Sequence, residues 1–180
     1  MTKTLDGYEL FFNFFDNISH EKMIEFGLSN LITTHHNIAA NEWSIIKDKL
    51  INNEELYIRG YGRDAKGTDL YLHLYSELFN NNSIKKDSTN NHNPTKHIQS
   101  WTKHSKSPTK KQLNDGFNKI KNFQISHVFG KTKNPLLFIA PWNIIVLPKI
   151  MDPFTGHEAK GDLKDKFTVA FRNYILHEYS

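Results

Sequence analysis

Two histidines, an asparagine and an aspartate follow one another between short apolar runs in residues 122–161. His127 comes after FQIS, Asn143 stands directly before IIVL, and Asp152 and His157 lie beyond that run. A neutral imidazole can remove a proton from a water molecule as that water attacks phosphorus. Carboxylate and imidazole groups can hold a divalent cation. These residue types are therefore candidates for metal-assisted hydrolysis.

The strand expected before His127 decides which side chain faces this site. Side chains alternate along a strand, so Ser126 and His127 should point to opposite faces. We choose His127, because the strand should end there and its twist can turn the ring outward. A histidine that only bonds a backbone carbonyl is the alternative.

The metal ligands are expected after the second apolar run. If the segment MDPFTGH is helical, Asp152 and His157 point in different directions and cannot share one ion without a break. Pro153 and Gly156 supply such a break. His157 is the preferred ligand, with Asp152 as its rival or companion, and Glu158 or Asp162 could complete the set.

The absence of cysteine narrows the choice of metal. Thiolate ligands are excluded, so the ion must be held by oxygen and imidazole ligands. Magnesium or manganese is therefore expected more than zinc.

In this order, His127, Asn143 and His157 resemble the HNH, or ββα-metal, nuclease motif. The resemblance covers residues 122–161 and implies that His127 is a general base. It implies that the amide of Asn143 bridges the backbone of the loop between the two strands, although a simple turn asparagine is the alternative. The pattern departs from the family at Ser126, where an acidic residue or a second histidine is common.

The resemblance implies a restriction-endonuclease-like member of that family. The expected activity is metal-dependent hydrolysis of DNA, as in site-specific restriction or phage defence. Duplex DNA is the expected partner, and a homodimer is expected because cutting both strands commonly uses two sites. A non-catalytic basic nucleic-acid-binding module and an RNA-directed nuclease or toxin are the alternatives.

Positive charge is concentrated in the middle of the chain. The formal net charge is +4, whereas residues 84–121 alone hold nine lysines against two aspartates. This stretch is either a surface that follows phosphates or a solvated connector. The glycine-rich loop GRDAKG, preceded by Arg59, is either a phosphate contact or an ordinary turn. The predicted nucleic-acid-binding residues are Arg59, Arg63, Lys66, Lys85, Lys86, Lys96, Lys103 and Lys131.

The elements that must position these residues predict an α+β fold. It is mainly helical, with a C-terminal ββα-metal hairpin and helix. Helical spacing predicts helices over residues 8–18, 20–31, 41–50, 68–79, 94–101 and 108–120, and a last helix from 162. The first buries an aromatic stripe, and Ser19, Thr68 and Asp162 are expected caps. Residues 56–61 read as a strand, and 80–93 as a flexible loop or a segment that orders on nucleic acid.

Three regions follow from this pattern, within one compact domain. Residues 1–121 form a helical support and nucleic-acid-binding region, 122–161 the catalytic module, and 162–180 a packing helix. The sequence shows neither a secretory signal nor an apolar run long enough to span a membrane. A cytoplasmic protein without membrane contact is therefore expected.

Overall fold

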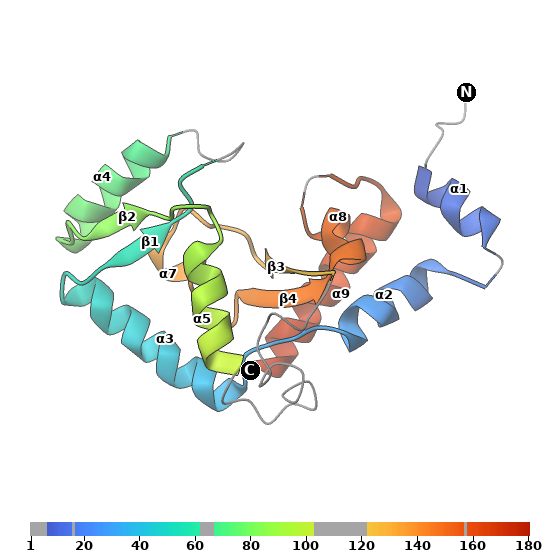
Figure 1. Cartoon of the computed structure of the whole chain (residues 1–180), viewed down its shortest axis with the longest axis horizontal. Coiled ribbons are helices and arrows are strands. Elements are labelled where there is room, and N and C mark those ends of the chain that lie inside the picture. Colours follow the sequence, from blue (N-terminus) through green and yellow to red (C-terminus); the bar gives the residue numbers. More distant parts are fainter. Residues whose placement is uncertain (1–6, 16, 62–66, 103–121, 157) are drawn as a thin grey trace.

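The computed structural model describes the chain except for residues 1–6, 16, 62–66, 103–121 and 157 (Figure 1). The described part mixes helices with two small sheets, which confirms the α+β class. The helix expected over residues 108–120 lies outside the described residues. Among the described helices, none combines the length and the apolar character needed to cross a membrane.

The described elements follow the chain in an order that alternates helices with short strands. They are α1 (Gly7–Phe14), α2 (His20–Ser29), α3 (His36–Ile51), β1 (Leu56–Ile58), α4 (Thr68–Phe79), β2 (Ile84–Lys86), α5 (His92–Thr102), β3 (Phe123–His127), α7 (Pro135–Phe138), β4 (Ile144–Pro148), the 3-10 helix η3 (Lys149–Met151), α8 (Asp152–Thr155) and α9 (Asp162–Glu178).

Strand β4 is the centre of the fold. It pairs antiparallel with β3, and its Ile144 lies opposite His127. On its other edge, Val146 exchanges two backbone hydrogen bonds with Ile32, at 2.8 and 3.0 Å. Every residue of β4 is buried. A strand that is covered on both faces reads as a continuous apolar run, which is the pattern IIVLP shows.

The two faces of β4 belong to different hydrophobic cores. Ile144 and Val146 pack in a cluster with residues of α3, β1, β2, α5 and α7. Ile145 and Leu147 pack in a second cluster with α8 and α9, against which α2 also packs. Successive side chains of a strand point to opposite faces, so one strand can serve both cores. The β3–β4 hairpin accordingly lies between two groups of helices (Figure 1).

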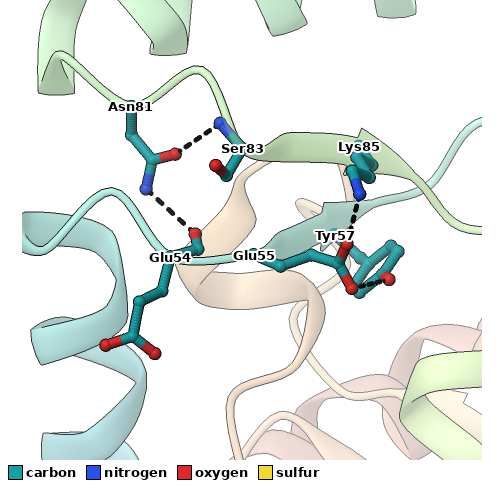
Figure 2. Close-up of polar contacts among 6 residues, drawn as sticks. All are labelled: Glu54, Glu55, Tyr57, Asn81, Ser83 and Lys85. Carbon is teal, nitrogen blue, oxygen red and sulfur yellow. Dashed lines mark hydrogen bonds and ion pairs between the residues drawn. The ribbon is translucent and has the colours of Figure 1, made fainter.

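The polar stretch over residues 80–93 is folded, which corrects the flexible loop expected there. It contains β2, which pairs in parallel with β1. The buried amide of Asn81 donates to the Glu54 carbonyl at 3.2 Å and accepts from the Ser83 N–H at 2.8 Å (Figure 2). It also donates to the Leu50 carbonyl at 3.0 Å. Side-chain amides can thus replace the apolar burial that this stretch lacks.

Asp87 fixes the end of the same stretch. Its buried carboxylate accepts from the backbone N–H groups of Thr89, His92 and Asn93 at 2.8–3.0 Å, and from the Asn93 side chain at 2.8 Å. Burial alone would raise the pKa of Asp87, but these donors outweigh burial and lower the pKa. The turn that leads into α5 is therefore organised around one ionised side chain.

Helix α4 has the expected bounds but not the expected cap, and its row of leucines faces outward. Its Tyr75 and two other large residues pack against the core, whereas the outward leucines are 50–67 % exposed. Those leucines are Leu70, Leu74 and Leu78. The cap position is Gly67, which makes no side-chain bond, while Thr68 is buried. The stripe of leucines and the stripe that contains Tyr75 both have helical spacing. Only the position of the core decides which of them is buried.

The N-terminal helix also differs from expectation. The aromatic stripe expected to be buried is exposed, with Phe14 at 81 %, whereas Phe12, which lies outside that stripe, is buried. Helix α1 lies at the periphery, so one side of it meets the core (Figure 1). Ser19 caps α2 as predicted, and accepts from the Lys22 N–H at 3.2 Å. Asp162 does not cap α9, since the cap position is Gly161.

Candidate functional site

One open cavity of about 850 Å³ lies beside the β3–β4 hairpin. The residue after β1, residues of α4 and β3, the loop after β3, and α8 with the turn that follows it all contribute to its wall. Those with ionisable or catalytic potential are Arg59, His127, Lys131, Lys133, Asp152 and Glu158. The fold thus brings an imidazole, two carboxylates and three cationic groups to one water-accessible space.

The ring of His127 is held in one orientation within this wall. Its Nε2 lies 2.9 Å from the carbonyl oxygen of Phe138, and the two rings stack at 5.4 Å with an interplanar angle of 12°. A carbonyl oxygen only accepts hydrogen bonds, so Nε2 carries the proton. The other ring nitrogen, Nδ1, is therefore the basic one.

The surroundings of His127 keep its ring neutral. Burial lowers its pKa, the hydrogen bond to Phe138 opposes that shift, and the positive charge of Arg59 lowers the pKa further, to about 4. The imidazole is consequently uncharged near pH 7. This is the protonation state that a general base requires.

The buried amide of Asn143 holds the loop between the two strands. Its Oδ1 accepts from the Phe129 N–H at 2.8 Å. Its Nδ2 donates to the carbonyl oxygens of Gly130 and Leu137, at 3.1 and 2.7 Å. Leu137 precedes Phe138, whose carbonyl orients His127. Asn143 therefore bridges the loop backbone as expected. Its bond to Leu137 holds the residue next to Phe138, and the Phe138 carbonyl bonds the imidazole.

The same loop is joined to β1, which carries Arg59 into the cavity. The Arg59 N–H donates to the carbonyl oxygen of Thr132 at 2.8 Å. Asn134 caps the short helix α7 by accepting from two backbone N–H groups at 2.9 and 3.1 Å. Arg59 is distant in sequence from His127. The backbone hydrogen bond to Thr132 holds Arg59 at the same cavity.

Asp152 and Glu158 supply the negative charge of the cavity. Burial raises the pKa of Asp152, the charge of Glu158 raises it further, and Lys149 opposes both. A bound cation would relieve this unfavourable proximity. Glu158 lies over Gly156, where an added Cβ would meet the Glu158 carboxylate.

The predicted metal ligands differ in where the structure places them, and the metal itself stays a prediction. No three histidine, aspartate or glutamate side chains within that part of the chain gather around one point. His157, the preferred ligand, lies outside it. Asp162 does not line the cavity and instead pairs with Lys166 at 2.7 Å. Two carboxylates nevertheless fit Mg²⁺, which commonly takes one or two carboxylates and completes its shell with water and phosphate oxygens.

The predicted nucleic-acid-binding residues separate into groups. Arg59 and Lys131 line the cavity. Lys85 pairs with Glu55 (Figure 2), and Lys86 pairs with Asp69 at 2.6 Å. Lys96 lines a smaller hollow along α5. Arg63, Lys66 and Lys103 lie outside the described residues.

Lys133 lines the cavity but was not predicted, and Glu158, which also lines it, was named only as a residue that could complete the metal ligands. Each adjoins a predicted one: Lys133 is two residues after Lys131, and Glu158 follows His157. Only their closeness in sequence to predicted residues could have indicated that they line the cavity. The fold of the loop decides which neighbours do so.

Acid is expected to destabilise this protein between pH 6.5 and pH 4. Burial lowers the pKa of His97, helped by the charges of Lys49 and Lys96, to about 4, which is also the pKa of His127. In this window the unfolded state binds more protons, so the free energy of unfolding falls as the pH falls, by about 1.4 kcal/mol per pH unit for each histidine. Urea denaturation at several pH values measures the slope.

The variants His97→Gln and His127→Gln should each flatten that slope. A free energy of unfolding that stays constant from pH 6.5 to pH 4 in the unmodified protein would contradict the prediction.

Fold and site together define an α+β protein with a polar cavity, in which a neutral imidazole shares a wall with carboxylates and cations. The family described as "Uncharacterised protein PM1201" matches residues 34–180. A Pasteurella multocida (strain Pm70) protein of that description is 42 % identical over 175 residues, which cover 97 % of this chain and 74 % of that protein. The chain therefore belongs to the PM1201 family. No solved structure matches it significantly.

These comparisons correct the family expected from the sequence. The predicted membership of the HNH family is wrong, because the family that matches is the PM1201 family and no HNH or nuclease family does. The HNH-like pattern consists of a few residue types at loose spacing around a local hairpin and loop. Such a short pattern does not determine descent, and the chemistry has to be argued from the site itself.

Proposed function

We propose that this protein is a metal-dependent nuclease that hydrolyses phosphodiester bonds in DNA. The observation that supports the proposal is the shared cavity, in which the neutral ring of His127 lies with Asp152 and Glu158 and with three cationic side chains. A phosphodiester needs a base to activate water and positive charge to hold the phosphate, and the cavity offers both.

In the proposed reaction, Nδ1 of His127 accepts a proton from a water molecule as its oxygen attacks phosphorus. Arg59, Lys131 and Lys133 hold the negatively charged phosphate oxygens. The bond between phosphorus and the leaving oxygen breaks, and that oxygen takes a proton from solvent. Asp152 and Glu158 would hold a divalent cation, which when bound offsets phosphate charge and stabilises the leaving oxygen.

A restriction or phage-defence role, a cytoplasmic location and action as a homodimer on duplex DNA belong to the same proposal. They rest on analogy with nucleases of similar chemistry, and cutting both strands commonly uses two sites. The alternative is a basic module that binds nucleic acid without cleaving it. Cleavage is the observation that separates the two.

Metal dependence is the first test. The purified protein should nick or linearise plasmid DNA with Mg²⁺ or Mn²⁺, and should leave it intact with EDTA, because Asp152 and Glu158 would then lack the cation that offsets phosphate charge. Asp152→Asn should raise the Mg²⁺ concentration for half-maximal cleavage by about tenfold or more, since it removes a charged oxygen ligand. Agarose-gel rates over a metal titration measure both effects.

Asp48→Asn is the matched control, because Asp48 is an exposed aspartate of α3 remote from the cavity. It should titrate as the unmodified protein does. Equal metal requirements for Asp152→Asn and the unmodified protein would remove Asp152 from the metal site. Intact plasmid under all metals, with DNA still bound, would replace the nuclease by the binding module.

A further inference from the structure

Two tyrosines of α4 form an aromatic part of the cavity wall. Tyr71 and Tyr75 both line the cavity, and their ring centroids lie 6.1 Å apart with an interplanar angle of 33°. Tyr71 keeps 36 % of its surface exposed. The ammonium nitrogen of Lys133 lies over the Tyr71 ring, 5.2 Å from its centroid. A partly exposed aromatic ring and the cation over its face therefore share one side of the cavity.

We infer that Tyr71 and Lys133 form a subsite for an unpaired base and its phosphate, so that duplex DNA is locally unpaired where one of its strands enters the cavity. This inference rests on the proposed nuclease function and names the form of its substrate. A duplex offers the edges of its bases in the grooves, because the base faces are already stacked on one another. An aromatic ring gains most from a base whose face is free.

The size of the cavity agrees with this assignment. A volume of about 850 Å³ falls within the range of pockets that enclose small molecules. Such a space is large enough for a nucleotide of one strand. A base stacked on Tyr71 would bring its phosphate toward Lys133, and that strand would continue toward His127 within the same cavity.

Polar groups nearby could bond the edges of the base. Asn91 also lines the cavity. An amide offers both a donor and an acceptor, so it can bond a base edge of either kind. Aromatic stacking beside a cationic groove is the combination that binds single strands with little sequence preference.

Binding in EDTA tests the subsite without requiring cleavage. A short single-stranded DNA carrying one 2-aminopurine should lose fluorescence on binding, as the base stacks on the ring. Tyr71→Ala should weaken this binding roughly 5- to 100-fold and abolish the fluorescence change, whereas Tyr71→Phe should keep both. Affinity for a blunt duplex should be nearly the same in all three proteins.

Tyr174→Ala is the matched control, because Tyr174 of α9 is similarly exposed, at 38 %, and does not line the cavity. It should bind both DNAs as the unmodified protein does. Unchanged single-strand affinity in Tyr71→Ala, or equal weakening toward duplex, would overturn the subsite even if plasmid is cleaved. Stacking on Tyr71 without cleavage under any metal would support the subsite while removing the nuclease proposal.

Discussion

Replacing His127 with alanine is expected to slow plasmid cleavage by about 100- to 10,000-fold, the usual contribution of a positioned general base. Because Nε2 donates its proton to the Phe138 carbonyl, Nδ1 is the basic nitrogen of the ring. The change to alanine removes that nitrogen. Arg59 and the lysines remain, so DNA binding should change little. Initial rates of nicking at saturating Mg²⁺, with binding measured separately in EDTA, test this separation of chemistry from affinity.

His127→Gln makes the same test with less damage to the fold. A glutamine amide can still donate to the Phe138 carbonyl but cannot take a proton from water. His177→Ala is the matched control, because His177 is exposed near the end of α9 and remote from the cavity. Folded His127 variants that cleave at the rate of the unmodified protein would show that the imidazole is structural.

Replacing Asn143 with alanine is expected to lower the free energy of unfolding by about 3 kcal/mol or more. The amide is fully buried and makes three hydrogen bonds of 2.7–3.1 Å to the loop backbone. Alanine leaves one N–H and two carbonyl groups without these partners. Urea denaturation, followed by circular dichroism, measures the loss.

Asn143→Asp should destabilise the protein at least as much, although it is closer in shape. A carboxylate can still accept from the Phe129 N–H, but it would face the two carbonyl oxygens that the amide now bonds. Asn173→Ala, at an exposed position of α9, should be nearly neutral. An Asn143→Ala protein as stable as the unmodified one would mean that the loop is held by other contacts.

Cleavage by Asn143→Ala should also fall, although Asn143 does not line the cavity. Its bond to the Leu137 carbonyl positions the residue before Phe138, and the Phe138 carbonyl orients His127. Asn143 is therefore a positioning residue. Loss of cleavage at temperatures where the variant remains folded would separate this role from its effect on stability.

Several features could be predicted from short stretches of sequence. Ser19 caps α2, α4 runs from Thr68 to Phe79, and residues 144–148 form a buried strand. Capping, helix periodicity and apolar runs are governed by residues within a few positions of one another. The pairing of β3 with β4 and the bridging by Asn143 also fall within one short segment.

Other features depended on segments that are far apart in sequence. The pattern of α4 contains two apolar stripes, and the core selected the one with Tyr75 while leaving Leu74 exposed. Lys85 and Lys86 were expected to bind phosphate, but distant Glu55 and Asp69 pair with them. A sequence lists charges without saying which opposite charge will lie beside them.

By itself, the sequence determined the helices, the hairpin and the loop around His127 and Asn143, because hydrogen bonds and periodic burial act locally. Only the tertiary structure decided that Arg59, His127 and Asp152 line one cavity and that β4 serves two cores. The physical reason is that electrostatic and packing interactions depend on distance in space. The folded chain sets that distance, and separation along the sequence does not.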